Sequence, residues 1–336
     1  MDRGHDFGKG HTARIAKGTA FEISYWLFVI SKITVKQKER EENMTRRWTN
    51  IKDTDAGSPT TIYTITAGPL NSWLIGSNQG VWRYVPEMGT YQNVSSALKE
   101  VAITALAYSK RLVMVGAADG LAVSVDGESW QQAELPKQTA VTQIALTSYF
   151  DQTGIAYAVT LEDGLMRSMD IGRSWATCNF GLIDKEAVAI ALSADFPNDM
   201  TILAAFSTGV FKTSNMGSAW RELSIDAEAM PMACLAMMPS VALAGSETHG
   251  LYYSTDQGES WFKRSTFVSG PISALASSPD GNTIALATPQ VVATSTDLGE
   301  TWTRTEGKTP KNIIALSVAD DGMVVCGTQQ DGLWVY

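Results

Sequence analysis

The chain has 336 residues, of which 44% are hydrophobic and only 18% charged, and its formal net charge is −9. A chain of this length can bury a large core, and few charges are typical of strands packed between neighbouring layers. The acidic balance argues against nucleic acid and makes a membrane surface a poor partner. We expect the three cysteines (Cys178, Cys234 and Cys326) to be free thiols in a reducing compartment, with no metal or disulfide role.

Residues 1–43 do not share the pattern of the rest of the chain. Their one apolar stretch, residues 21–30, is half the length of about 20 residues that a membrane-spanning helix needs. A signal peptide is the alternative, but the small-residue cleavage pattern is missing. We therefore expect a poorly structured leader outside the native fold and a cytoplasmic location, with export as the alternative if the leader is a signal or anchor. Residues 44–336 then carry 18 basic and 29 acidic residues, a net charge of −11.

The two ends of the remaining chain complement each other. Residues 45–51 contain Trp48 but none of the turn sequence that precedes similar tryptophans later in the chain, and the last unit ends one strand short at residues 331–336. Pairing these two segments would close a ring of sheets and leave no long edge exposed. The first unit has a degenerate turn, in which Gly89 and Tyr91 replace the usual glycine and tryptophan.

Five nearly identical segments then follow the pattern Ser/Thr-x-Asp/Asn-x-Gly-x-x-Trp, one of them shortened by a residue. They occupy residues 124–130, 168–175, 213–220, 254–261 and 295–302, and their tryptophans recur every 41 to 45 residues. A repeat of this length indicates a β-propeller or a solenoid.

Each residue type in this segment has a structural explanation. The Asp or Asn can accept hydrogen bonds from backbone N–H groups one or two residues further on. The glycine allows positive φ, and the tryptophan buries a large ring beside the turn. We therefore interpret the segments as hairpin clasps. Their structural residues are Asp126, Trp130, Asp170, Trp175, Asn215, Trp220, Asp256, Trp261, Asp297 and Trp302.

Apolar runs recur at matching positions in all seven units and predict the innermost strands of the repeat. These runs are residues 62–67, 103–109, 144–148, 190–194, 234–238, 272–278 and 313–319. With four short strands in each unit, the sequence predicts an all-β, seven-bladed propeller of four-stranded antiparallel blades over residues 44–336, closed by residues 45–51 and 331–336.

The repeated pattern resembles the Asp-box, or BNR, repeat over about residues 45–336. Propellers of this kind include sialidases, xyloglucan-acting glycosidases, sortilin-type receptors and the photosystem II stability and assembly factor. The blade count and short loops most resemble that last group and its WD40/YVTN/BNR-like relatives. The resemblance implies the fold firmly and the function loosely, because one fold serves many activities.

Sialidases of this superfamily hold their substrate with three arginines on the face away from the boxes. The propeller arginines of this chain lie outside the predicted innermost strands, and several follow box tryptophans. No arginine triad can be assembled, so we expect no sialidase catalytic residues. The sequence also lacks GxSxG, CxxC, HExxH and phosphate-binding glycine motifs, and we expect no cofactor and no metal.

The turns between the second and third strands are expected on the face opposite the boxes, together with the connections between blades. Most of these turns are also good hairpin sequences in their own right. The candidate ligand or partner residues on this face are Asp119, Glu162, Asp163, Glu247, His249 and Asp331, with Phe180 and Phe267 as apolar anchors in the connections.

Two functions are compatible with this arrangement. The favoured one is a non-catalytic interaction or assembly module that binds a protein or peptide on the face opposite the boxes. The alternative is a glycan-binding or glycoside-hydrolysing propeller, which would need two carboxylates about 5–10 Å apart.

Overall fold

The computed structural model describes residues 46–336, with the exception of 53–56, 95, 99 and 267. The chain divides into two units, Met1–Thr45 and Arg46–Tyr336. The predicted leader and Phe267 lie outside the described residues. Among the helices of the described part, none is long and apolar enough to cross a membrane.

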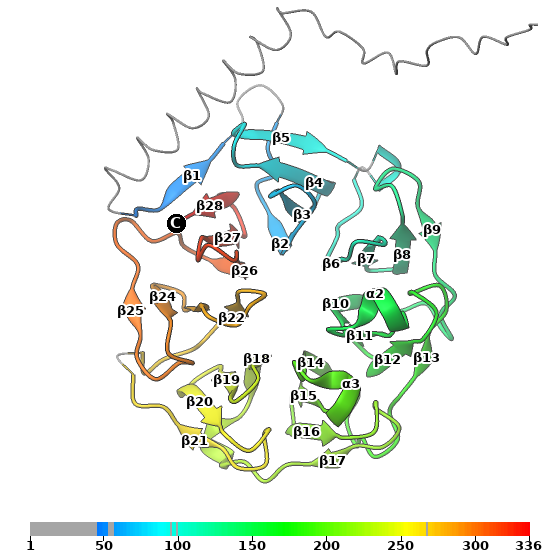
Figure 1. Cartoon of the computed structure of the whole chain (residues 1–336), viewed down its shortest axis with the longest axis vertical. Coiled ribbons are helices and arrows are strands. Elements are labelled where there is room, and N and C mark those ends of the chain that lie inside the picture. The colour runs from blue at the N-terminus through cyan, green and yellow to red at the C-terminus, as the bar shows by residue number, and fades with distance from the viewer. Residues whose placement is uncertain (1–45, 53–56, 95, 99, 267) are drawn as a thin grey trace, which may run out of the picture. The chain divides into compact units, whose positions relative to one another are not determined.

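The second unit consists of seven four-stranded antiparallel sheets arranged around a central axis, with the first strand of each sheet innermost (Figure 1). Blade 1 contains β2 (Ile62–Ala67), β3 (Trp73–Ser77), β4 (Gly80–Val85) and β5 (Thr90–Asn93), and blade 2 contains β6 (Ala105–Tyr108), β7 (Val113–Ala117), β8 (Gly120–Ser124) and β9 (Gln131–Gln132). Blade 3 contains β10 (Val141–Leu146), β11 (Ala156–Thr160), β12 (Leu165–Ser168) and β13 (Ala176–Thr177), and blade 4 contains β14 (Ala187–Leu192), β15 (Ile202–Phe206), β16 (Val210–Thr213) and β17 (Arg221–Glu222). Blade 5 contains β18 (Met232–Met237), β19 (Ala242–Ser246), β20 (Gly250–Ser254) and β21 (Phe262–Lys263), and blade 6 contains β22 (Ala274–Ser277), β23 (Ile284–Ala287), β24 (Val292–Ser295) and β25 (Thr303–Arg304).

Blade 7 joins the two ends of the unit. It contains β26 (Ile313–Val318), β27 (Val324–Thr328), β28 (Leu333–Val335) and, as its outer strand, β1 (Thr49–Ile51). Thr49 pairs with Val335 and Ile51 with Leu333, so the predicted closure is confirmed. Trp48 is buried beside this strand, and its indole Nε1 donates to Thr305 Oγ1 of blade 6 at 2.8 Å.

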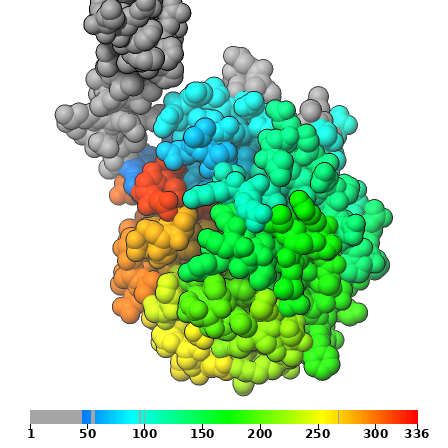
Figure 2. Space-filling model, turned by 45° about the vertical axis from the view of Figure 1, so that its right-hand side comes forward, coloured from blue at the N-terminus to red at the C-terminus, as the bar shows by residue number. Residues whose placement is uncertain are grey.

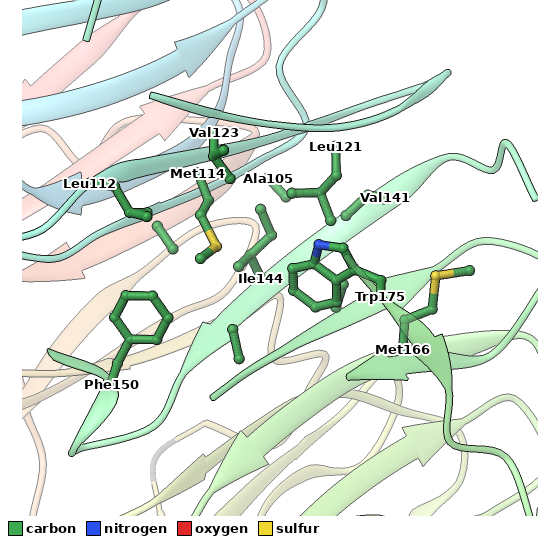
Figure 3. Packing of buried hydrophobic residues seen from close by; sticks show 13 residues of the cluster. Ala105, Leu112, Met114, Leu121, Val123, Val141, Ile144, Phe150, Met166 and Trp175 are labelled. Atoms are coloured by element: carbon green, nitrogen blue, oxygen red, sulfur yellow. The ribbon is translucent and has the colours of Figure 1, made fainter. Parts of the chain in front are cut away.

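The hydrophobic core lies between neighbouring blades. Between blades 2 and 3, Met114 and Val123 face Phe150 and Trp175 across the gap that separates the two sheets (Figure 3). Similar clusters recur around the ring, and in the space-filling view the side chains of successive blades meet without a break (Figure 2). The second strands are therefore buried on both faces, which explains why they read as continuous apolar runs.

Two glycines in second strands show how closely the blades approach. A Cβ at Gly116 would lie 2.7 Å from Val141 Cγ1, and a Cβ at Gly327 would lie 2.4 Å from Ile62 Cγ2. Each contact joins a second strand to the residue that begins the innermost strand of the next blade. Any larger side chain would force the blades apart.

The cysteines belong to this core. All three are free, as predicted, and Cys178 and Cys326 are buried. Burial raises the pKa of the Cys178 and Cys234 thiols to about 12. Their chemistry is therefore that of small apolar side chains.

The ring has two different faces. One face carries the boxes and the turns between first and second strands, including the short helices α2 (Phe150–Thr153) and α3 (Phe196–Asp199). A hydrogen bond joins these two features in blade 3, where the N–H of Ile171 in the box donates to the carbonyl of Gly154, just after α2, at 3.0 Å. We call this face the box face. The opposite face carries the turns between second and third strands and the connections between blades, with the short helices η1 (Ser96–Leu98) and η2 (Ala227–Ala229). We call it the turn face.

Candidate binding face

The boxes form nearly identical hydrogen-bonded clasps. In the box of blade 3, the Ser168 hydroxyl donates to Asp170 Oδ1 at 2.8 Å and accepts from the Gly172 N–H at 2.9 Å. Asp170 also accepts from the Ser174 N–H at 2.9 Å, and the Trp175 indole donates to the Gly172 carbonyl at 3.0 Å. The boxes of blades 5 and 6 repeat these four bonds.

The predicted spacing of the aspartate bond is wrong for the eight-residue boxes. The accepted N–H lies four residues on, because Ile171 and Gly172 both have positive φ, 62° and 78°, and turn the chain back toward the carboxylate. In the shortened box of blade 2, Asp126 accepts from residues two and three positions on. The extra residue in the longer box accounts for the difference.

The clasps leave the box carboxylates ionised and occupied. The backbone N–H of Ser260 is the main cause that lowers the pKa of Asp256 to about 2, and the hydroxyl of Thr301 does the same for Asp297, also to about 2. Asn215 replaces Asp in blade 4 and makes the equivalent bonds to Thr213 and Ala219. An uncharged side chain can therefore make the same turn bonds, which supports a structural role for the aspartates of the other boxes.

On the turn face, each turn lies between the connection that enters its blade and the connection that leaves it. In blade 3, the Leu161 N–H donates to Ala140 of the entering connection, and the Gly164 N–H donates to Lys185 of the leaving one, both at 3.0 Å. Blades 1 and 7 make the same pair of bonds. These bonds hold the turns of these three blades rigidly against their connections.

The structure places the predicted turn residues on this face, as expected from strand order. Asp119, Glu162 and Glu247 are exposed. Asp163 forms an ion pair with Lys137 at 3.3 Å, and Asp331 forms one with Lys52 at 3.1 Å; both lysines lie in connections between blades. His249 Nδ1 lies 2.7 Å from Thr248 Oγ1.

These residues do not converge on one point. They belong to four different blades, and Asp163 in blade 3 lies across the ring from Asp331 in blade 7 (Figure 1). Within the described residues, no three His, Cys, Asp or Glu side chains are grouped closely enough to hold a metal ion. A bond from the Thr139 hydroxyl is the main cause that lowers the pKa of Asp163. This carboxyl is therefore poorly suited to donate a proton near neutral pH.

The arginines lie outside the innermost strands, as the sequence predicts. Of those that the structure describes, none lies on an innermost strand: Arg83 and Arg167 are on third strands, and Arg221 and Arg304 on outer ones. An arginine triad around the central axis is therefore not formed by these residues.

Phe180 lies in the connection between blades 3 and 4. It is 78% exposed, but its carbonyl accepts from the N–H of Trp220, where the outer strand of blade 4 begins. The structure therefore places this predicted anchor at the outer rim of the ring.

A different apolar set, which the sequence did not single out, lies between blades 3 and 4 on the turn face. Leu161, Ile183 and Val188 are 53%, 78% and 38% exposed. The turn that carries Leu161 is bonded to the connection that carries Ile183, both through Lys185 and through the Asn179 side chain, which donates to Asp163. We call these three residues the blade 3–4 patch.

Val188 owes its exposure to a bulge. The pairing of β14 with β15 shifts register between Ala187 and Ala189, so Val188 has no partner in the ladder. The same shift occurs where the innermost strands of blades 1, 3, 5 and 7 begin. Such bulges redirect one side chain, and no sequence period announces them.

Comparison with known proteins bears on the family. A family model described as "Photosynthesis system II assembly factor YCF48" matches residues 122–332. A curated relative, the photosystem II assembly protein Ycf48 of Synechococcus sp. (strain JA-2-3B'a(2-13)), is 25% identical over 161 residues. That alignment covers 47% of this chain and 47% of the relative, so it spans about half of the relative's length.

Solved structures share the fold at low identity. A structure titled "YCF48 bound to D1 peptide" has a TM-score of 0.68 at 16% identity, covering 88% of this chain and 98% of that one. A streptogramin B lyase has a TM-score of 0.69 at 12% identity, covering 86% and 96%. The GH74 xyloglucanase of Xanthomonas campestris has a TM-score of 0.66 at 15% identity, covering 86% and 53%. The structural neighbours therefore include enzymes and a peptide-bound assembly factor, whereas the family model covers most of the propeller repeats. This chain belongs to the photosystem II assembly factor YCF48 family.

Proposed function

We propose that this protein is a non-catalytic assembly factor that holds a segment of a partner protein on its turn face. Its family consists of assembly factors, and the solved YCF48 structure is bound to a D1 peptide. A peptide that binds at blade 3 would meet a rigid surface, because the turn of this blade is hydrogen-bonded to both of its connections. A rigid surface loses little conformational entropy on binding.

The blade 3–4 patch is the observation that carries this proposal. Large apolar side chains that remain exposed on one rigid face are typical of interaction sites. Leu161 and Ile183 are both more than half exposed, and Glu162 is exposed in the same turn as Leu161. The patch therefore suits a segment with apolar side chains and a nearby basic residue.

The charge of the face supports the same partner chemistry. Asp119, Glu162 and Glu247 are exposed on three turns, and residues 44–336 carry a net charge of −11. Such a surface attracts basic segments and repels nucleic acid. We expect the association rate to fall as salt is added.

Glycoside hydrolysis has less support. The carboxylates of Asp163 and Asp331 are in blades on opposite sides of the ring and are each engaged by a lysine. A retaining or inverting pair must flank a single bond. If a panel of glycosides were hydrolysed and Asp163→Ala with Asp331→Ala abolished the turnover, the non-catalytic proposal would be wrong.

The proposal can be tested with a pair of matched variants. Ile183→Asp combined with Leu161→Asp places charges in the blade 3–4 patch. Met169→Asp is the control, because Met169 is 59% exposed in the same blade but on the box face. The probe is the D1 peptide of the YCF48 complex, labelled for fluorescence anisotropy with the full-length chain.

We expect the double variant to weaken peptide binding at least about tenfold and the control to leave it unchanged. Circular dichroism should show both variants folded, because all three positions are exposed. Equal binding by all three proteins, or an equal loss in the control, would contradict use of the turn face. The cytoplasmic location stays a prediction, which cell fractionation can check.

A further inference from the structure

The connection between blades 3 and 4, residues 178–186, exposes two large apolar side chains. Phe180 and Ile183 are each 78% exposed. Within the part of the chain that the structure describes, no other connection between blades exposes a large aliphatic or aromatic side chain. Apolar groups that gather on one surface segment are typical of a contact with another molecule.

Hydrogen bonds hold this connection to blade 3. The Asn179 side chain donates to the Asp163 carbonyl at 2.7 Å and accepts from the Leu165 N–H at 2.8 Å. Further along, the Lys185 carbonyl accepts from the Gly164 N–H at 3.0 Å. Both ends of the connection are therefore fixed to the turn between β11 and β12.

The same connection is also bonded to blade 4. The Phe180 carbonyl accepts from the Trp220 N–H at 2.9 Å. The Asp184 carboxylate accepts from the hydroxyls of Ser207 and Thr208, in the turn between β15 and β16, at 2.8 and 3.1 Å. The connection is therefore held from both sides, and a segment that binds on it meets a surface that is already ordered.

A tight turn presents Phe180 to solvent. The Leu182 N–H donates to the Asn179 carbonyl at 3.0 Å, and Gly181 has a φ of 93°, as the third residue of a type II turn requires. A Cβ at Gly181 would collide with the Trp220 carbonyl oxygen, so only glycine fits there. Leu182 packs against the core that blades 3 and 4 share. The backbone itself therefore keeps Phe180 exposed.

Phe180, Ile183 and the rest of the blade 3–4 patch lie on a path from the rim to the axis of the ring. Phe180 lies beside the start of β17, the outer strand of blade 4, whereas Val188 lies on β14, its innermost strand (Figure 1). Ile183 is on the connection between them, and Leu161 is on the turn that is bonded to this connection. We call these four residues the apolar strip.

The length of the apolar strip indicates the length of its ligand. Three strand spacings of about 4.8 Å separate β14 from β17, which gives about 14 Å across the blade. An extended chain rises about 3.3 Å per residue, so about five residues cover this distance. Side chains on one side of such a segment recur at every second residue, about 6.6 Å apart. Three apolar side chains at alternate positions would therefore meet the rim end, the middle and the axis end.

The charges beside the apolar strip favour a basic segment. Glu162 and Glu186 are exposed, and neither forms an ion pair with a residue that the structure describes. The one lysine on this turn and connection is Lys185, and Lys137 of the preceding connection is already paired with Asp163. The carboxylates on the same turn and connection are those of Glu162, Asp163, Asp184 and Glu186. The surplus is negative, so it attracts lysine or arginine.

We propose that the apolar strip binds an extended segment of the partner protein, about five residues long, with apolar side chains at three alternate positions and a lysine or arginine beside them. This inference rests on the proposed function and gives the partner segment a length, a direction across blade 4 and a sequence pattern. A helix with the same apolar spacing would need about ten residues, and isolated helices of that length are marginal in water.

Two peptides of the same composition test the pattern. The first, Lys-Val-Ser-Val-Ser-Val-Lys, alternates, and the second, Lys-Ser-Val-Val-Val-Ser-Lys, does not; both are acetylated and amidated. Each is labelled for fluorescence anisotropy and titrated with the full-length chain. We expect the alternating peptide to bind at least about tenfold more tightly, because only it can turn all three valines toward the strip. Equal binding, no binding, or tighter binding of a ten-residue helical peptide with valines four residues apart would overturn the proposal.

Phe180→Ser tests the rim end of the apolar strip. We expect this variant to weaken the alternating peptide about tenfold. Phe262→Ser is the matched control, because Phe262 is 55% exposed on the outer strand of blade 5. Circular dichroism should show both variants folded, since both side chains are exposed. An equal effect of the two variants would contradict the proposal.

Glu162→Gln combined with Glu186→Gln tests the charge. We expect weaker binding of the alternating peptide and a smaller dependence of its affinity on salt. An unchanged affinity at every salt concentration would overturn the assignment of a basic segment. Sedimentation of the full-length chain tests the other occupant: a dimer that Phe180→Ser dissociates would mean that a second copy covers the strip, and the proposal would fail.

The outcomes distinguish the apolar strip from the proposed function. If the Leu161 and Ile183 double variant weakens D1 peptide binding but Phe180→Ser changes the binding of neither peptide, the proposed function stands and the strip fails. If Phe180→Ser weakens the alternating peptide but the double variant leaves D1 peptide binding unchanged, the strip stands as a peptide site and its use for the D1 peptide fails.

Discussion

The two faces of the ring differ in how uniform they are. On the box face, blades 3, 5 and 6 make the same four hydrogen bonds with nearly the same distances. The polar groups involved bond to residues of the same box. On the turn face, among the residues that the structure describes, only the turns of blades 1, 3 and 7 make the same pair of bonds to their connections, and the turns differ in their side chains, from Leu161 to Pro289. The comparison teaches that the repeated residues are structural and that candidates for function are found where one blade departs from the others.

The largest effect should come from removing a box tryptophan. Trp175→Ala opens a cavity between blades 2 and 3 and removes the bond to Gly172, so we expect a loss of about 3–5 kcal/mol in the free energy of unfolding. Urea denaturation measures it. Trp130→Ala is the control and should cost less, because Trp130 is only partly buried and its indole N–H has no partner among the described residues. If the folded fraction of Trp175→Ala no longer bound the D1 peptide, the two faces would not act independently.

A smaller effect is expected where the blades meet beneath the turn face. Gly327→Ala would place a Cβ 2.4 Å from Ile62, and we expect a loss of about 1–3 kcal/mol by thermal or urea unfolding. Gly270→Ala is the matched control, since a Cβ there meets nothing within 4 Å, and should change stability by less than about 0.5 kcal/mol. Equal stability of the two variants would show that the ring can expand at its closure.

The box carboxylates should make the stability depend on pH only in acid. The pKa of Asp256 is about 2 in the folded state, below the ordinary value of about 3.9, so its contribution is present above pH 4 and is lost as the pH falls toward 2. Asp256→Asn should be nearly neutral at pH 7, because Asn215 already serves in blade 4. The variant should then lose less stability than the wild type between pH 4 and 2. Parallel acid unfolding curves would contradict this account.

The smallest effect is expected from an ion pair on the turn face. Lys137→Ala breaks the pair with Asp163, but the lysine is 66% exposed and the Thr139 hydroxyl still bonds to the carboxylate. We expect a loss below about 1 kcal/mol that shrinks further in high salt. Urea denaturation at two salt concentrations measures it. A loss above about 2 kcal/mol would mean that the turn face is as structural as the box face.

Much of the fold could be predicted because its signals are local and repeated. The boxes, the seven apolar runs and the incomplete last unit led to the correct blade number and to the closure of residues 45–51 on 331–336. The site was predicted only as a face. Strand order placed Asp119, Asp163 and Asp331 on it, but it could not reveal that Asp163 and Asp331 are paired with lysines and lie across the ring from each other.

By itself, the sequence determined the architecture of this protein, because hairpin clasps and apolar strands depend on residues within a few positions of each other. The tertiary structure decided which surface features come together. Val188 is exposed by a register shift, and Asp163 is paired with Lys137, which lies 26 residues away in the chain. The physical reason is that neither a bulge nor an ion pair between separate segments has a local signature, because each depends on residues that only the folded ring brings together.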